Sequence, residues 1–446
     1  MKNFSLEQIK AVQDLYEVLQ NDSLKERQYG ESKVEEGRSE YARDYARILY
    51  SSSFRRLQGK MQILGIESTA FYRNRLTHSL EVSQIARSIA RTLAFKCDKK
   101  EMYSEEELYL LDAAALGHDI GHPAFGHKGE RVLDEIAKVH GLRFEGNAQN
   151  YRVLCKLDRH GSSPDGLNLT YRTLLAINKY IVEEGYDTKK FMYNEDYEFL
   201  EKFRRENKLE NQRTLDVQII ELADDIAYAV HDLEDGLSQG LFSIDELCYE
   251  IRSYQNKEME KEQIENACTK FKAILTDIQD KLSNDSKEET DPYKIKTIQE
   301  YSHLFRKNLT SNLTDEFVRN LSFNEEKKEL CIEEPYGTLC KILSKIIFTC
   351  VSRNSEVALY ETKGEIVLKT LFNIYVDEKI NKNYYLLPPD YRPENDEIKT
   401  IVRCVLDYLA GMMDTYAISE YERLTGESFY NMNINNIPEI KKWSLK

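Results

Sequence analysis

The stretch 116–130, with the sequence LGHDIGHPAFGHKGE, constrains this chain more than any other. Three of the chain's eight histidines, His118, His122 and His127, fall within it, and Asp119 directly follows the first. Neutral imidazole and carboxylate are the usual protein ligands of divalent metals, and imidazole also carries protons near neutral pH. The cluster therefore indicates a metal or proton-transfer site; the alternative is a polar helix end with three solvated histidines.

The segment just before this cluster, 108–116 (LYLLDAAAL), predicts a buried helix because it is apolar and rich in alanine. His118 and Asp119 follow at its C-terminal end, and Pro123 stops the helix soon after. The helix dipole disfavours a carboxylate at this end unless a cation lies nearby. The position of Asp119 therefore favours a metal ligand.

His127 lies in an expected loop at 126–129, and Glu130, three residues later, opens an expected helix at 131–139. A carboxylate at this spacing can orient an imidazole and share its proton. The two residues are therefore a candidate acid–base pair.

A fourth histidine lies upstream, in the sequence RNRLTHSLEV at 73–82. Thr77 is expected to cap a helix there, which places His78 in the first turn. Arg75 can offer a planar, permanently charged fork to a phosphate. Alone, His78 would more often be a capping or surface residue, and the cluster downstream makes it a candidate ligand.

Three other stretches have a weaker signal. Arg55, Arg56 and Lys60 form a basic cluster, which fits a solvated helix face and a site for an anionic ligand equally well. The short apolar run 62–67 is expected to be extended. The charged stretch 183–214 is expected to be a surface excursion.

The segment 215–237 (LDVQIIELADDIAYAVHDLEDGL) has a helical period of apolar residues that acidic residues interrupt. On such a helix Asp224, Tyr228 and Asp232 share one face, whereas Asp225 points about 100° away from Asp224. A buried carboxylate needs a partner. This face is therefore a further candidate for the site, and an exposed acidic stripe is the alternative.

Composition narrows the class of protein. Only 19 Gly and 8 Pro among 446 residues, with abundant Leu, Glu and Lys, predict a mostly helical chain. The net charge of −15 argues against a general nucleic-acid binder or a protein of anionic membrane surfaces. Scattered cysteines without CxxC spacing, no signal peptide and no long apolar run predict a cytoplasmic protein without a membrane span.

The order of these motifs resembles the HD-domain phosphohydrolases. The residues of these motifs are similar to those of the deoxynucleoside triphosphate triphosphohydrolases, in the deoxyguanosine-triphosphatase-like branch. The matching motifs are FRRLQGK, NRLTHSLEV, LGHDIGHPAFGHKGE, FEGNAQ, LNLTYRTL, ELADDIAYAVHDLED and, at 407–417, DYLAGMMDTYA. The resemblance implies a mostly α fold with an HD-domain catalytic core at 1–240 (motifs at 41–237). It also implies a helical C-terminal region at 241–446 that packs on the core and takes part in oligomer contacts.

The resemblance implies an activity and its partners. The substrate would be a deoxynucleoside triphosphate (dNTP), either dGTP or several dNTPs, and the products deoxynucleoside and inorganic triphosphate. Each subunit would bind one divalent ion, and the resemblance does not distinguish among Mn, Mg, Fe, Ni, Co and Zn. Homo-oligomers, tetramers or hexamers, and dNTPs as allosteric activators are also implied. The alternatives are an HD phosphohydrolase acting on another nucleotide and a non-catalytic nucleotide sensor. Nucleic-acid binding would be a secondary role.

The same resemblance assigns residues to three tasks. The implied metal ligands are His78, His118, Asp119 and Asp224. The implied catalytic residues are His127, Glu130 and His122. The implied substrate contacts are Gln62 for the sugar 3′-hydroxyl, Arg75 for phosphate, Tyr228 for the base, and Asn147, Lys179 and Asp232.

Two details qualify this assignment. Asp224 is preferred to Asp225 because the family's ligand precedes a Tyr by four residues and an Asp by eight, which agrees with the helical face above. Met61 departs from the family, whose members commonly have Thr beside the sugar-reading Gln, and this departure bears on the sugar pocket.

Overall fold

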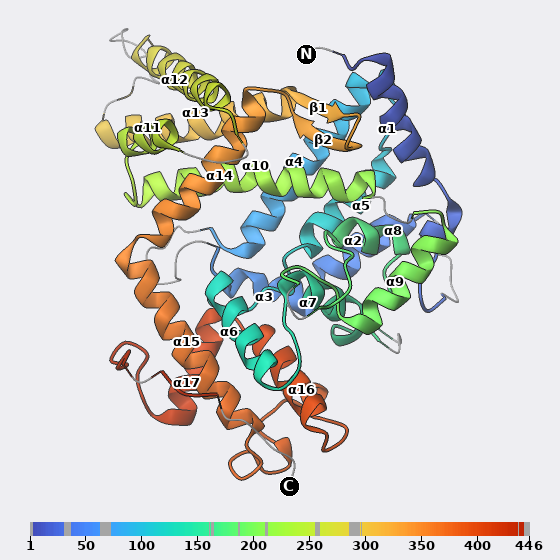
Figure 1. The fold of residues 1–446 in the computed structure, drawn as a ribbon, viewed down its shortest axis with the longest axis vertical. Helices are drawn as coiled ribbons and strands as arrows, with labels where there is room; N and C mark the ends of the chain where they lie inside the picture. The colour runs from blue at the N-terminus through green and yellow to red at the C-terminus, as the bar shows by residue number, and fades with distance from the viewer. Residues whose placement is uncertain are drawn as a thin grey trace. The chain divides into compact units, whose positions relative to one another are not determined.

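The computed structural model describes residues 3–30, 37–62, 73–159, 161, 165–185, 188–209, 213–254, 259–284, 295, 297–435 and 437–440. Across these ranges the chain forms seventeen α-helices and one two-stranded antiparallel sheet (Figure 1). The predicted mostly α fold is confirmed. The expected extended run at 62–67 lies outside the described residues except for Gln62.

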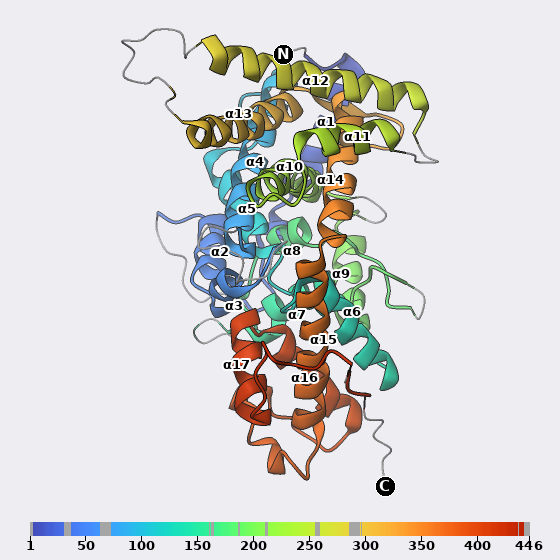
Figure 2. The ribbon, with the colours of Figure 1, turned by 90° about the vertical axis from the view of Figure 1, so that its left-hand side faces the viewer.

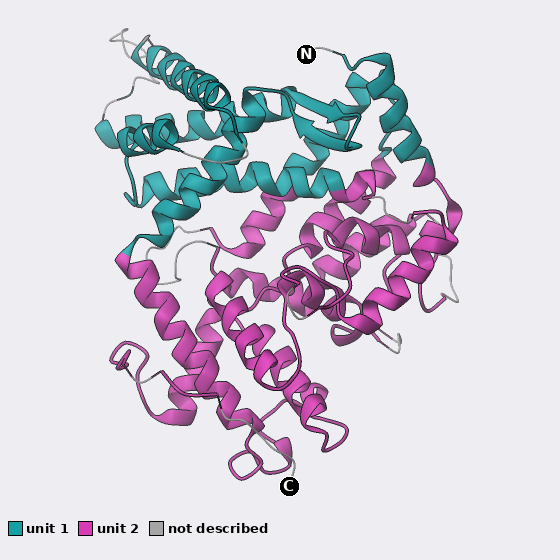
Figure 3. Ribbon diagram, in the orientation of Figure 1, with its two compact units in different colours: residues 1–17, 84–104, 218–354 teal, residues 18–83, 105–217, 355–446 magenta. Residues whose placement is uncertain are grey.

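The chain divides into two compact units, each assembled from three segments (Figure 3). Unit 1 comprises Met1–Glu17, Gln84–Ser104 and Gln218–Asn354. Unit 2 comprises Val18–Ser83, Glu105–Val217 and Ser355–Lys446. Both units contain residues from either side of position 240, and the division into a catalytic core and a C-terminal region stays a prediction.

Unit 2 carries the histidine-rich motifs. Its helices are α2 (Glu40–Leu49), α3 (Ser52–Arg56), α5 (Glu105–Gly117), α6 (Gly126–Val139), α7 (Gly146–Arg152), α8 (Tyr171–Ile177), α9 (Asn194–Glu206), α15 (Ser355–Val376), α16 (Ile398–Ala410) and α17 (Asp414–Thr425). Helix α5 packs against α2 and α8, and α15 packs against α6, α16 and α17. The C-terminal helices therefore share a hydrophobic core with α6, which carries the predicted acid–base pair.

Unit 1 contains most of the chain between 218 and 354. Its elements are α1 (Leu6–Val18), α11 (Ile244–Ser253), α12 (Lys261–Asn284), α13 (Ile298–Arg319), β1 (Leu321–Asn324), β2 (Glu329–Ile332) and α14 (Tyr336–Ser352). Figure 2 shows α12 lengthwise, and this helix packs against both α13 and α14. Helices α4 (Arg75–Lys96) and α10 (Leu215–Ser238) begin in unit 2 and continue in unit 1.

The helices predicted from apolar periodicity are present. The buried helix expected at 108–116 is α5, whose side chains from Leu110 to Leu116 are almost all inaccessible. The helix expected at 215–237 is α10. The stretch 183–214 is not a surface excursion, because it contains α9 and the buried residues Phe191 and Leu200.

The N-terminus of α4 differs from the prediction that Thr77 caps it. The Asn74 Oδ1 accepts a hydrogen bond from the Thr77 N–H at 3.0 Å, and the Thr77 Oγ1 accepts one from the Asn74 N–H at 3.1 Å. Asn74 is therefore the capping residue, and Thr77 completes a reciprocal pair from the first turn. His78 still lies in that turn, with its N–H donating to the Asn74 carbonyl.

The loop predicted at 126–129 is also wrong, because α6 begins at Gly126. Phe125 and Gly126 have φ angles of 61° and 57°, in the left-handed region, so the chain turns sharply into the helix. Gly129 lies inside this helix, and the position requires glycine because a Cβ there would lie 1.9 Å from the Ala124 carbonyl oxygen. His127 and Glu130 consequently lie about one helical turn apart at the start of α6.

Candidate functional site

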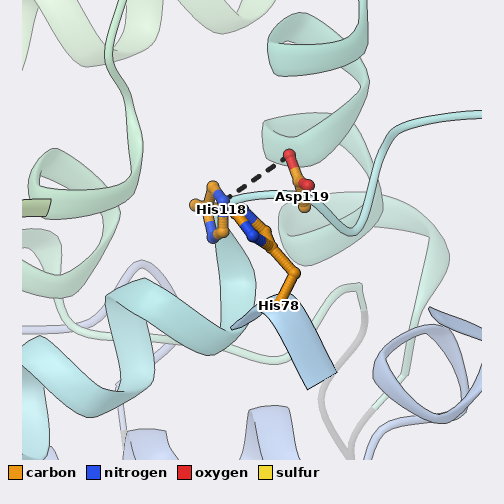
Figure 4. Close-up of side chains that lie close together, drawn as sticks. All are labelled: His78, His118 and Asp119. Carbon is orange, nitrogen blue, oxygen red and sulfur yellow. Dashed lines mark ion pairs between the residues drawn. The ribbon is translucent and has the colours of Figure 1, made fainter. Parts of the chain in front are cut away.

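His78, His118 and Asp119 converge in unit 2 (Figure 4). One ligand atom from each residue lies within 4.8 Å of the other two, and all three residues are buried. His78 comes from the first turn of α4, whereas His118 and Asp119 follow α5 directly. Two imidazoles and a carboxylate make a donor set that suits a divalent ion.

The backbone orients the His118 ring for metal binding. Its Nδ1 lies 2.7 Å from the Ala115 carbonyl oxygen, which can only accept a hydrogen bond. The proton therefore sits on Nδ1, and Nε2 keeps its lone pair on the side of Asp119 Oδ1, 3.6 Å away. These residues fit a bound divalent cation.

Asp119 lies between two further predicted site residues. Its Oδ2 accepts a hydrogen bond from Arg75 Nη1, and its Oδ1 lies 3.0 Å from His122 Nδ1. Burial opposes the ionisation of Asp119, but His122, Arg75 and His118 together hold its pKa well below the usual range. Burial lowers the pKa of His122 despite the neighbouring Asp119. The site therefore combines an ionised Asp119 with a neutral His122.

Hydrogen bonds of the Ser83 and Asn150 side chains hold the backbone around this cluster in place. The Ser83 Oγ of α4 donates to Asp112 Oδ1 of α5 at 2.7 Å, which ties the two helices together. The Asn150 side chain of α7 donates to the His118 carbonyl and accepts from the Gly121 N–H. A Cβ at Gly121 would lie 2.3 Å from the Asn150 backbone nitrogen, so this close approach requires glycine. Asn150 was not predicted, and its only signal is its place directly after the FEGNAQ motif.

His127 and Glu130 face each other near the start of α6. The His127 Nδ1 lies 3.7 Å from Glu130 Oε2, and the His127 ring meets the His122 ring edge-on at a centroid distance of 6.3 Å. The His127 side chain is 49% exposed and that of Glu130 only 14%. Burial opposes ionisation of Glu130, but His127, His122 and Lys190 hold its pKa below the usual range. The pair thus joins an accessible imidazole to a sheltered carboxylate.

A lysine that the sequence did not predict joins this pair. Lys190 Nζ lies 3.3 Å from Glu130 Oε1 and 2.6 Å from Glu145 Oε1. The predicted substrate contact Asn147 donates from its side chain to the same Glu145 oxygen at 2.7 Å. Asn147 is therefore linked to the acid–base pair through two residues, Glu145 and Lys190.

Two other predicted substrate contacts lie in unit 2. The Gln62 side chain is buried, and neither its amide nitrogen nor its oxygen has a partner among the residues that the structure describes. Buried amides are almost always hydrogen-bonded, so this one suits a ligand. Lys179 follows α8, and its Nζ lies 5.7 Å from the ring centroid of Tyr180.

The predicted acidic face of α10 lies in unit 1. Asp225 is exposed, Asp224 and Tyr228 are half-buried, and Asp232 is buried. Around the helix axis, Asp225 points away from the other three residues, as the period of an α-helix predicts. The assignment of Asp224 to the metal and of Tyr228 and Asp232 to the substrate stays a prediction.

Lys60 does not belong to a surface basic patch. It is buried, and its Nζ donates to the His122 carbonyl and, at 2.9 Å, to the Ala410 carbonyl. Arg55 is exposed, so the three basic residues of this segment do not share one environment. The solvated-face explanation is therefore wrong for Lys60, which ties the turn at His122 to the end of α16, and the anionic-ligand alternative stays a prediction.

Asp414, in the C-terminal motif DYLAGMMDTYA, supports the turn into α6. Its Oδ1 accepts from the Phe125 N–H at 3.2 Å. Its Oδ2 accepts from the Met61 N–H at 3.3 Å and from the Tyr360 hydroxyl at 3.1 Å. The buried carboxylate thus holds Phe125 in its left-handed conformation, just before the acid–base pair.

Replacing Asp414 by asparagine should change how stability depends on pH. Burial raises the pKa of Asp414 from 3.8 to about 6, although hydrogen bonds from Phe125, Met61 and Tyr360 oppose the rise. Between these values the folded protein holds a proton that the unfolded chain has released. This stabilisation is present below pH 3.8 and is lost as the pH rises through 6.

The unfolding free energy of the wild type minus that of Asp414→Asn should therefore fall by roughly 2 kcal/mol between about pH 4 and pH 6.5. Chemical denaturation of both proteins across this range measures it. A difference that stays constant would show that folding does not shift the pKa of Asp414.

Comparison with known proteins agrees with this site. Residues 75–229 match the HD domain, and residues 330–423 match the phosphohydrolase-associated domain, which includes Asp414. No helix in the described part of the chain is both long and apolar enough to cross a membrane.

Similarity to whole proteins extends over nearly the full chain. The deoxyguanosinetriphosphate triphosphohydrolase-like protein 2 of Vibrio cholerae serotype O1 is 40% identical over 92% of this chain and 95% of its own length. A deoxyguanosinetriphosphate triphosphohydrolase-like protein of Rickettsia felis is 32% identical over 90% of this chain and 94% of its own. One from Shewanella halifaxensis is 30% identical over 90% and 95%. The chain therefore belongs to the HD-domain, deoxyguanosinetriphosphate triphosphohydrolase-like family.

Proposed function

We propose that this protein hydrolyses dNTPs, dGTP or several of them, to deoxynucleoside and inorganic triphosphate in a metal-dependent reaction. One structural observation carries the proposal: the buried cluster of His78, His118 and Asp119 is linked through His122 to an accessible His127. In addition, relatives that match nearly the whole chain are named for this reaction.

The divalent ion would be held by His78, His118, Asp119 and Asp224. When bound, such an ion acidifies a coordinated water or polarises a phosphoryl oxygen. Arg75 keeps Asp119 ionised and oriented, and its guanidinium is the group we assign to the triphosphate.

His127 and Glu130 would move the proton. Attack of water at the α-phosphorus releases the 5′-oxygen of the sugar, so one proton must leave the water and one must reach that oxygen. His127 can serve either end, because its ring is accessible and Glu130 stabilises it when it is protonated. The neutral His122, whose Nδ1 lies beside Asp119, has its ring next to that of His127.

The remaining assignments concern substrate and assembly. The unpartnered amide of buried Gln62 suits a sugar hydroxyl. We assign Tyr228 to the base. The three other predicted substrate contacts, without a more specific role, are Asn147, Lys179 and Asp232. A cytoplasmic homo-oligomer, a tetramer or hexamer with dNTPs as activators, is part of the same proposal.

Product analysis tests the function. The purified protein is incubated with Mn²⁺ or Mg²⁺ and each dNTP alone, then with all four together. Deoxynucleoside and triphosphate are the expected products, and turnover in the mixture alone would indicate an activating dNTP. Release of orthophosphate or pyrophosphate would point to another HD phosphohydrolase reaction. Bound metal with no turnover under any condition would contradict the proposal and favour a nucleotide sensor.

A further inference from the structure

Lys190 makes two contacts with carboxylates around the acid–base pair. Its Nζ lies 2.6 Å from Glu145 Oε1 and 3.3 Å from Glu130 Oε1. The Glu130 Oε1 also accepts a hydrogen bond from the Gly146 N–H at 3.3 Å. One oxygen of Glu130 is thus held by a cation and an amide, and the other oxygen, Oε2, is left on the side of His127.

The backbone that carries Lys190 is firmly anchored. Phe191 and Met192 follow it and are almost completely buried. The Met192 N–H donates to the Val182 carbonyl at 2.8 Å, and the Tyr193 hydroxyl donates to Gln149 of α7 at 3.0 Å. A lysine on such a segment starts from a fixed backbone position, so only its side chain must be ordered when it holds a carboxylate.

Glu145 anchors the other side of the lysine. Its side chain is 2% exposed, and its Oε2 accepts a hydrogen bond from the Ala148 N–H at 2.8 Å as the cap of α7. Lys190 itself is 39% exposed, but both of its partners are sheltered. This arrangement differs from an exposed surface ion pair, in which both side chains move freely and contribute little.

We propose that Lys190 is a positioning residue for catalysis: it fixes the Glu130 carboxylate so that Oε2 faces His127. The inference rests on the proposed function of the His127–Glu130 pair. Lys190 has no contact with the reacting atoms in this role. It acts through Glu130, whose rotation about its own side chain would otherwise break the alignment with the imidazole.

Lys190→Met and Lys190→Arg test the inference. A matched control is Lys156→Met, because Lys156 also lies between two carboxylates, Glu195 at 2.9 Å and Asp196 at 3.1 Å, and is 33% exposed. The substrate is each dNTP and their mixture, with triphosphate release as the signal. Metal content and melting temperature are measured for every variant.

Lys190→Met should lower kcat roughly 10- to 100-fold with little change in KM, in bound metal or in melting temperature relative to Lys156→Met. Lys190→Arg should restore most of kcat, because it keeps the charge. The acid limb of the pH–rate profile should move to higher pH in Lys190→Met, because Glu130 loses a cation that lowers its pKa. His127, His122 and the Gly146 N–H are the other groups that face this carboxylate.

Three results would overturn the inference: kcat and an acid limb equal to those of Lys156→Met, a loss that Lys190→Arg does not restore, or a loss explained by missing metal. Crystal structures of the wild type and Lys190→Met add a test that needs no substrate. The Glu130 carboxylate should turn away from His127 in the variant, and an unchanged carboxylate would contradict the positioning role. If the wild type releases no triphosphate, the proposed function fails, and these structures still decide whether Lys190 orients Glu130.

Discussion

Replacing His127 by alanine should lower kcat by roughly 10²- to 10⁴-fold, because the imidazole is the accessible partner of a sheltered carboxylate. The variant should keep its metal, since His127 is not part of the His78–His118–Asp119 cluster. Its stability changes little, because the side chain is half exposed. Triphosphate release, metal content and melting temperature measure these three effects on the same preparation.

His303→Ala is the matched control, since His303 is an exposed histidine of α13. It should leave all three quantities unchanged. Unchanged turnover in His127→Ala would rule out the assigned proton transfer. Loss of metal together with turnover would place His127 among the ligands instead.

The largest combined effect is expected for Asp119→Asn. The amide is a poor metal ligand, so metal and activity should both be lost. It also removes the negative charge that faces Arg75, whose side chain is 1% exposed. Removing one partner of a buried ion pair costs about 3–5 kcal/mol.

Denaturant unfolding in the presence of a chelator separates this cost from the loss of metal. The comparison is between the metal-free wild type and metal-free Asp119→Asn. Asp112→Asn is the control, because Asp112 is a buried carboxylate of α5 that an amide can replace as acceptor for Ser83. It should keep metal and activity. A metal-free Asp119→Asn as stable as the wild type would mean that the Arg75 pair contributes nothing to the fold.

The parts of the site that the sequence predicted are those encoded over short distances. The spacing in LGHDIGHPAFGHKGE was enough to single out His118, Asp119, His127 and Glu130. The period of the apolar residues in α10 separated Asp225 from its neighbours, because each residue of a helix turns by a fixed angle. These inferences depend on local geometry, which the chain sets within one or two helical turns.

The residues that were missed act over long separations. Lys190 is 60 positions from Glu130, and Asp414 is 353 positions from Met61. Lys190 stood in a charged stretch that resembled a solvated surface, and only the fold shows that its neighbours Phe191 and Met192 are buried. A lysine or an aspartate has no pattern of its own that tells whether it is solvated or holds another residue. Contacts of this kind depend on packing that sequence periodicity does not encode.

Two hydrogen bonds tie the turn around His122 and Phe125 to the C-terminal helices: Lys60 donates to Ala410, and the Phe125 N–H donates to Asp414. They have a consequence for the order in which the protein matures on the ribosome. Every residue assigned to metal, proton transfer or substrate is translated before the C-terminal motif emerges. A nascent chain that ends before Ala410 therefore contains a complete set of reactive groups but lacks the acceptors that fix their turn. We therefore expect the turn around the candidate site to reach its final geometry only after the last helices have been made.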